Sequence, residues 1–461
     1  MMEKSPRPRV LHCWVWMFWW FVLPANASFG GTYPLVARQD TGQGQVVQVL
    51  LEVRGELKLN AEGRGTRSLP LEVDAKLHYQ ERFLDFSDDP WRRRSVRHYD
   101  EAFASIKAGG GLVNRRLDPD HRTILVEARG GAHVLFSPRQ PLRREQVELL
   151  DVLGSSLLID HILPQRAVNV GEQWNVDSDA LAGLFSLEVV TENDAVVRLA
   201  SVEDDVALIE IEGRIGGSIG GVASDIDFKA RCNFDLRQQR LTWYAVSLRE
   251  KRAIGHAQPG FEVTARLRMV LEPAASLESL SDEKLARLPP DDAASRLLIY
   301  QPERSYYRLI HDRRWHAMID RHDLSVLRLV DRGELVAQCN ISELPDLEPG
   351  QHLALKEFQS QIRHTLRDRF GQFIEATQST GEDGRRVLRV VVAGSASEVP
   401  IQWIYYHISD PQGRRAAIAF TLEASLAERF AEADRKLVES FQFAPRPQQA
   451  QREATDSPAR L

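Results

Sequence analysis

The chain has 461 residues, of which 43% are apolar, so it is long and apolar enough to form two or three domains with cores of their own. For the chain as a whole, this composition excludes a disordered polar protein and a membrane protein with many spans. The 59 Lys and Arg residues are interspersed with 65 Asp and Glu residues, and the formal net charge is −6. The chain therefore has no overall basic field that could attract phosphates, and we expect no nucleic-acid partner.

The first residues have the three parts of a secretory signal peptide. Basic residues precede an apolar run over residues 13–23, and the small-residue stretch 25–27 follows it. The run is much shorter than the roughly 20 residues that a bilayer-spanning helix needs. We therefore expect residues 1–27 to be cleaved, which would leave no stable transmembrane anchor. The mature chain would be exported to the periplasm of a bacterium or to the extracellular space.

Only Cys232 and Cys339 remain after the expected cleavage, so the chain is not a disulfide scaffold although an export route permits disulfides. Each cysteine lies in a run that alternates apolar and polar residues. Two interpretations follow from this pattern. Both cysteines are small buried hydrophobic residues, or they form a bridge between domains.

Alternating apolar and polar residues run from Val47 to Leu59 and again from Leu71 to Tyr79. A period of two is typical of half-buried strands, so these two runs predict a hairpin. A helix is expected after Pro141. Because short turns join many of the later strands, we expect antiparallel pairing, and a sheet this long should curl on itself. Residues 40–272 would then form one curved antiparallel sheet or open barrel with one or two helices. The later strands are expected at residues 123–127, 133–137, 196–202, 206–212, 226–235, 241–248 and 261–271.

The composition changes at residues 273–299, where prolines, acids and small residues replace large apolar ones. This change predicts a linker between two domains. A second unit is expected at residues 300–443, which is an ordinary domain size. Residues 444–461 are rich in Pro, Gln and Arg and should form a disordered tail.

The second unit is expected to begin with three strands, near residues 315–319, 326–330 and 335–341. A helix should follow from about residue 352 to residue 370 and end at Gly371. Four strands come next, with Asp383 and Gly384 marking a hairpin turn. Ser425 and Glu428 form a capping-box pattern that predicts the start of a closing helix. The fold class predicted for the whole chain is α+β.

The second unit has the order strands, helix, four strands and helix, with Arg314 and Trp315 near its opening. A pattern at its close consists of Phe430, Asp434, Leu437, Ser440, Phe441 and Phe443. This order and these residues resemble the PsbP-like α/β/α sandwich. The resemblance covers residues 300–443 and implies a binding module without a common catalytic site.

The first domain resembles exported bacterial lipoprotein-carrier domains of the LolA/LolB type, which are curved sheets with helices over the concave face. The stretch from Leu163 to Trp174 is also similar to exported bacterial domains of unknown function. The carrier resemblance implies an acyl chain held between the sheet and its helices.

One dense cluster of side chains could supply metal ligands. On a strand, His316 and Asp320 share one face, whereas the flanking groups belong to turns at opposite strand ends. A metal site needs three or four converging ligands, so solvated turn residues are the favoured interpretation. The metal-ligand candidates are His311, Asp312, His316, Asp320 and His322.

Three other signals have structural interpretations. Ser218 lies in a G-x-S-x-G pattern, but an alternating strand follows it where a hydrolase needs a helix. The basic run at residues 88–94 beside Trp91 is expected to be a charged loop. Trp403 lies in an apolar run that is typical of a central strand, so it is expected in the core.

These observations assign no catalytic residue and no cofactor. We expect an exported, non-enzymatic binding or accessory protein of the bacterial cell envelope, with another protein or a hydrophobic small molecule as its partner. One alternative is a carrier that holds a hydrophobic ligand such as an acyl chain in the first domain. A second alternative is a metal-dependent hydrolase that uses the cluster around His316.

Overall fold

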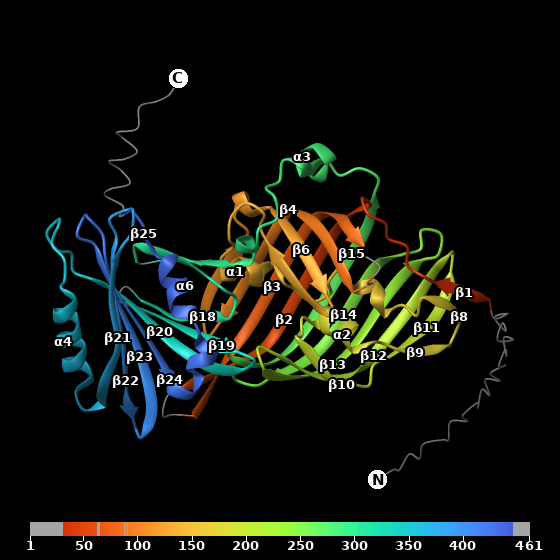
Figure 1. Ribbon diagram of the computed structural model, residues 1–461. Coiled ribbons are helices and arrows are strands. Elements are labelled where there is room, and N and C mark those ends of the chain that lie inside the picture. Colours follow the sequence, from red (N-terminus) through yellow and green to blue (C-terminus); the bar gives the residue numbers. More distant parts are fainter. Residues whose placement is uncertain are drawn as a thin grey trace, which may run out of the picture.

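The computed structural model describes residues 31–61, 65–86, 89, 91–303, 305–321 and 323–445. The expected signal peptide, the metal-ligand candidate His322 and nearly all of the expected tail lie outside these residues. The described part is dominated by antiparallel sheets, with few helices (Figure 1). This agrees broadly with the predicted α+β class.

The largest sheet has 13 strands, all paired antiparallel, and contains the predicted hairpin as its two longest strands. Its main path runs β7-β6-β4-β3-β2-β15-β14-β13-β12-β11-β9, while β5 pairs with β4 and β10 pairs with β12. Its end strands, β7 and β9, do not pair with each other in the described part of the chain, so the sheet is open. The strands are β2 (Gly44–Ala61), β3 (Gly65–Phe86), β4 (Arg92–Ala108), β5 (Gly111–Arg116), β6 (Thr123–Arg129), β7 (Ala132–Phe136), β9 (Gln173–Asn175), β10 (Val189–Asn193), β11 (Val196–Glu203), β12 (Val206–Ile219), β13 (Val222–Asp235), β14 (Arg240–Arg252) and β15 (Gly260–Ala274).

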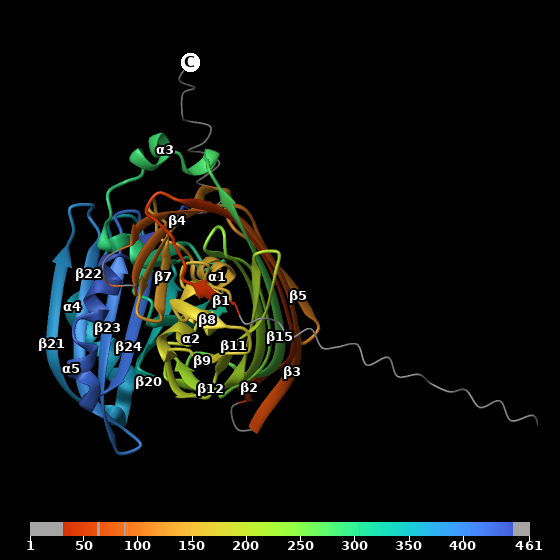
Figure 2. The same cartoon turned by 90° about the vertical axis from the view of Figure 1, so that its right-hand side faces the viewer.

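The concave face of this sheet packs against short helices and irregular chain. The helices α1 (Arg144–Leu150) and α2 (Ser178–Phe185) and a 3-10 turn at Ile159–Ile162 lie inside the curve (Figure 2). A small sheet of β1 (Thr32–Leu35) and β8 (Arg166–Asn169) packs at one end. Because every second residue of a strand points to the same face, the apolar half of each strand joins one continuous core with these helices.

A second sheet has seven antiparallel strands in the order β18-β19-β20-β24-β23-β22-β21. The helix α4 (Leu355–Leu366) packs on one face through Phe358 and Ile362, and α5 (Ala427–Phe430) and α6 (Ala433–Glu439) pack on the other face. A small sheet of β16 (Leu298–Tyr300), β17 (Tyr307–His311) and β25 (Gln442–Phe443) lies beside α6. The strands are β18 (Trp315–Arg321), β19 (Leu324–Asp331), β20 (Glu334–Leu344), β21 (Phe370–Thr380), β22 (Arg386–Ala396), β23 (Val399–Ser409) and β24 (Arg415–Glu423).

Two helices of the second unit differ from the predicted helices in where they begin and end. The helix expected to end at Gly371 ends at Leu366, and Gly371 already lies in β21, where an added Cβ would be 2.7 Å from the carbonyl oxygen of Ala393. The closing helix does not start with a capping box. A 3-10 turn contains Ser425, and a break with a positive φ at Ala431 separates α5 from α6.

The segment expected to be a linker is folded against the large sheet. It contains a 3-10 turn at Glu278–Leu280, the helix α3 (Asp282–Ala286) and a 3-10 turn at Ala293–Arg296. Leu280 is buried in a small cluster with Val96, Leu125 and Phe136. The predicted linker is therefore a packed connection.

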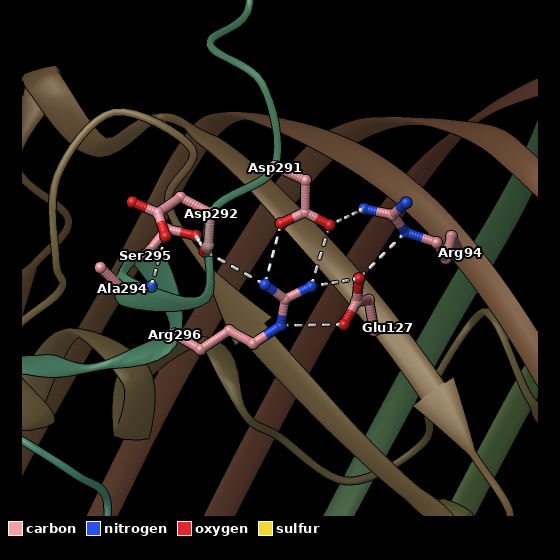
Figure 3. Close-up of polar contacts among 7 residues, drawn as sticks. All are labelled: Arg94, Glu127, Asp291, Asp292, Ala294, Ser295 and Arg296. Carbon is pink, nitrogen blue, oxygen red and sulfur yellow. Dashed lines mark hydrogen bonds and ion pairs between the residues drawn. The ribbon is translucent and has the colours of Figure 1, made fainter.

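A charged cluster fixes the end of this connection (Figure 3). Arg296 pairs with Glu127 of β6 at 2.6 Å and with Asp291 at 2.8 Å, and Arg94 of β4 contacts both carboxylates at 3.1 Å. The basic run expected to be a charged loop thus contributes strand residues, because β4 begins at Arg92. Its middle member, Arg93, is buried and pairs with Asp160 at 2.5 Å.

Arginines join the two large sheets across a shared junction. Arg144 of α1 donates to the backbone carbonyl oxygens of Arg313 and Trp315, at 2.5 and 2.9 Å. In return, Arg313 donates to the carbonyl oxygen of Leu135 at 2.6 Å. Arg328 of β19 donates to the carbonyl oxygen of His256 at 2.6 Å.

Two hairpin turns meet at the same junction. Gly221, between β12 and β13, and Gly333, between β19 and β20, both have positive φ values, of 70° and 80°. A Cβ added at Gly221 would lie 2.3 Å from the Cα of Gly333. Only glycine allows this backbone conformation together with this approach.

Candidate functional site

The predicted metal-ligand candidates do not converge. His311 ends β17, Asp312 pairs with Arg314 at 2.9 Å in the following turn, and His316 lies near the start of β18. Asp320 is exposed at the other end of β18. Among the residues that the structure describes, no group of three or more His, Cys, Asp or Glu side chains is arranged to hold a metal ion.

The two histidines instead belong to the junction between the sheets. His311 is buried, and its Nδ1 lies 2.7 Å from the carbonyl oxygen of Asp312. Burial and the nearby positive charge of Arg144 lower the pKa of His311 to about 4, although the hydrogen bond to the Asp312 carbonyl acts in the opposite direction. Burial, followed by the charges of Arg144 and His311, lowers the pKa of His316 to about 4 as well. Both side chains are therefore neutral near pH 7.

The remaining sequence signals have structural roles. Ser218 lies in β12, and a turn through Gly220 and Gly221 leads directly into β13, so the nucleophile elbow of a hydrolase is missing here. Trp403 is buried in the centre of the second sheet, as expected. Cys232 and Cys339 are both buried and are not bonded to each other, which agrees with the first of the two interpretations.

The interior of the large sheet contains a polar cluster that the sequence analysis missed. The Glu81 carboxylate is fully buried and accepts hydrogen bonds from Ser156 at 2.6 Å and from Gln45, Ser95 and Arg97 at 2.8 Å each. Burial alone would raise the pKa of Glu81, but the charge of Arg97 and these hydrogen bonds outweigh it and lower the pKa. The signal was a charged residue at an inward position between Tyr79 and Phe83.

This interior cluster is satisfied internally. Arg97 also donates to Ser156 at 3.0 Å, and the hydroxyl of Tyr79 lies 3.0 Å from the same oxygen. Around the cluster, the concave face is filled by buried apolar side chains such as Leu157, Leu158 and Phe185. A carboxylate held by four donors suits a structural role, because its lone pairs are already in use.

The outer face of the same sheet carries an open groove of about 1470 Å³. On β14, Tyr244, Val246 and Leu248 point into the interior core, so Trp243 and Ser247 point to the opposite face. Residues of β11, β12, β13, β14 and β15 line the groove. These strands are coloured yellow to green in Figure 1. Five strands at the usual spacing span about 19 Å.

Cross-strand register builds the floor and walls of this groove. Lys229, Ser247 and Arg266 lie directly opposite one another on β13, β14 and β15. Ala245 lies opposite Arg231 in the next row. The small side chains of β14 thus form a low floor between the long cationic side chains of the two neighbouring strands.

Only some of the cations in the groove have carboxylate partners. Arg231 pairs with Glu210 at 2.9 Å, and Lys229 pairs with Glu212 at 3.0 Å. Arg249 and Arg266 are exposed and form no ion pair in the described part of the chain. Two guanidinium groups therefore line the groove without a carboxylate at ion-pair distance, and Asp227 lies directly opposite Arg249 on β13.

Trp243 forms one end of the groove. Its side chain is partly exposed and does not belong to the apolar residues that pack on the interior core. Its indole Nε1 has no hydrogen-bond partner within the described ranges. The sequence signal was present in this strand, because a large aromatic residue occupies an outward position where the alternation predicts a polar one.

Comparison with known proteins finds no matching family model and no matching curated protein. Cyanobacterial PsbP from Synechocystis sp. PCC 6803 is 15% identical over 33% of this chain and 95% of its own, with a TM-score of 0.25. DynF from the dynemicin biosynthesis pathway of Micromonospora chersina is 6% identical over 55% and 90% of the two chains, with a TM-score of 0.17. A loop-deletion mutant of OmpT, an outer membrane protein of Vibrio cholerae, is 9% identical over 83% and 99%, with a TM-score of 0.11. The LolA/LolB type is not among these similarities.

Proposed function

We propose that the protein is an exported, non-enzymatic binding protein of the bacterial cell envelope, and that the outer groove is its ligand-binding surface. One contrast carries this proposal. The interior of the large sheet is filled with packed side chains, whereas its outer face has a large open groove with unpaired cationic donors. A rigid sheet suits recognition, because its side chains keep their spacing without a ligand.

The second sheet is proposed to be a PsbP-like binding module that accompanies the groove. Its layers support this assignment, since α4 covers one face and α5 and α6 cover the other. No helix among the described residues has both the length and the apolar character needed to cross a bilayer. Export through a cleaved signal peptide, to the periplasm or the extracellular space, is part of the proposal.

The two alternative functions have less support. An acyl-chain carrier needs a dry, apolar space between sheet and helices, but Leu157, Leu158 and Phe185 occupy that position. A metal-dependent hydrolase around His316 needs converging ligands, and Asp320 lies at the far end of the same strand.

Native mass spectrometry of residues 28–461, purified from an exporting host, tests the proposal. The expected result is the bare chain mass, unchanged after denaturation. A mass excess that disappears on denaturation and equals the mass of an acyl lipid would contradict the proposal of binding at the outer groove and would favour the acyl-chain carrier. Hydrolase or transferase activity that is reproducible and is lost on a single side-chain change would also contradict it.

A further inference from the structure

The chemistry of the outer groove points to one class of ligand. We propose that the outer groove binds an acidic polysaccharide, that is, a chain of sugar rings with spaced carboxylates. This inference rests on the proposed function, since it names the ligand of the same groove. Three features carry it: unpaired guanidinium groups, a partly exposed aromatic wall and a mixed polar lining.

The guanidinium groups provide the charge recognition. Arg249 lies near Ser247 on β14, and Arg266 lies directly opposite Ser247 on β15. Both are exposed, and neither forms an ion pair in the described structure. The planar guanidinium group can donate two parallel hydrogen bonds to one carboxylate, so each arginine is suited to one uronic acid group.

Trp243 provides the aromatic wall. It precedes Ala245 and Ser247 in the same outward row of β14, so its ring stands at the end of a low floor. A large, flat apolar surface with a free N–H donor suits a ligand that has an apolar face and polar edges. A sugar ring has this form, with C–H groups on its faces and hydroxyls on its edge.

The acids of the groove limit how densely charged the ligand can be. The lining contains the cations Arg198, Lys229, Arg231, Arg249 and Arg266 and the carboxylates Asp194, Glu210, Glu212 and Asp227. With nearly equal numbers of both signs, the groove lacks the strong positive field that would attract a dense polyanion such as a nucleic acid. Carboxylates accept hydrogen bonds from hydroxyls, however, so a ligand with many hydroxyls and few negative charges fits this lining.

The backbone argues against an extended acidic peptide. The groove lies on a sheet face, where the backbone N–H and C=O groups of β12 to β15 bond to neighbouring strands. A bound peptide would find few backbone partners for its own amides, and leaving these unpaired costs free energy. A polysaccharide has no amide ladder to satisfy and uses side-chain partners alone.

The test is titration calorimetry of residues 28–461 with size-fractionated oligosaccharides of polygalacturonate, alginate and hyaluronate. At least one acidic oligosaccharide should bind, and more weakly as salt rises, because exposed charges are screened. The double variant R249Q/R266Q should bind at least about tenfold more weakly, which corresponds to the loss of about 1.4 kcal/mol. W243A should also weaken binding, and the methyl-esterified oligosaccharide should bind less than the acid.

Matched controls separate ligand recognition from folding. Arg237 and Arg287 are exposed arginines that do not line the groove, so R237Q/R287Q should bind like the natural chain. Circular dichroism and the midpoint of thermal unfolding verify that every variant is folded.

Two results would overturn the assignment. One is the absence of binding to every acidic oligosaccharide, and the other is equal binding by folded R249Q/R266Q. Tighter binding of poly-L-glutamate than of any oligosaccharide would overturn the ligand class but leave the groove as a binding surface. A co-purified lipid in native mass spectrometry would instead overturn the binding proposal itself.

Discussion

Glu81 shows how a single buried charge depends on its partners. Replacing Glu81 with Gln keeps the shape of the side chain but leaves Arg97 as a buried cation without its counter-charge. We expect the free energy of unfolding to fall by about 3–5 kcal/mol, because removing one partner of a buried ion pair exposes the full desolvation penalty of the other. Urea unfolding measures this loss.

Glu212 provides the control for that variant. It pairs with Lys229 on the exposed outer face, where water screens the charges, so E212Q should change the stability little. An equal effect of E81Q and E212Q would contradict the structural role that we assign to the interior cluster.

His311 links the stability of the junction to pH. Its pKa is about 4 in the folded chain, against an ordinary value of 6.5, so between these values the unfolded chain binds a proton that the folded chain does not. The stability that depends on neutral His311 should therefore be fully present above about pH 6.5. As the pH falls towards 4, the free energy of unfolding should fall by up to about 3 kcal/mol.

Urea unfolding on both sides of this pH window measures the effect. H311Q removes the titrating group and should reduce the pH dependence, whereas H364Q, at an exposed position of α4, should leave it unchanged. Asp312, Arg313, Arg144 and His316 also surround this histidine, and His316 should add to the same slope. A pH dependence that is identical in H311Q and the natural chain would contradict the assignment.

At the scale of elements, α6 is attached to the second sheet by a buried carboxylate. Asp434 accepts a hydrogen bond from Tyr406 at 2.6 Å and from Arg389 at 2.9 Å. D434A leaves both donors without this acceptor, so we expect a loss of about 2–4 kcal/mol in the free energy of unfolding. E439Q changes an exposed position of the same helix and should have little effect. Chemical unfolding of both variants tests this, and equal stabilities would rule out the attachment.

The elements predictable from the sequence are those with a clear period. The strands β2 and β3 alternate over most of their length, and their pairing as a hairpin was predicted. Both predicted runs are shorter than the strands, above all the second, because β3 spans Gly65–Phe86. The helix expected after Pro141 is present but short, and it spans Arg144–Leu150. Leu157 and Leu158 lie beyond this helix, in irregular chain inside the curve of the sheet. They are buried all the same, because the concave surface accepts apolar side chains from any backbone conformation.

The candidate site was not predictable in the same way. Lys229, Ser247 and Arg266 come from three strands, and only the register set by the connecting turns brings them into one row. Each residue by itself is an ordinary outward-facing side chain. Glu81, in contrast, was detectable, since a carboxylate in the apolar half of an alternating strand must find a partner.

At the scale of the whole molecule, Arg144 and Arg313 should make the two sheets unfold together. Each donates to backbone carbonyls across the junction, so R144Q/R313Q removes direct bonds between the two cores. We expect calorimetry of this variant to show two separate transitions where the natural chain shows one. R314Q is the matched control, because Arg314 pairs with Asp312 within the same turn. A single transition in the double variant would contradict this coupling.

The contact between Gly221 and Gly333 has a consequence for how such a protein can diverge. Hairpin turns are normally where a chain gains or loses residues, because they project into solvent. These two turns meet backbone to backbone, and any side chain or inserted residue would push the sheets apart. Insertions should therefore accumulate in the other turns, and a change of length in one of these two would require a compensating change in the other.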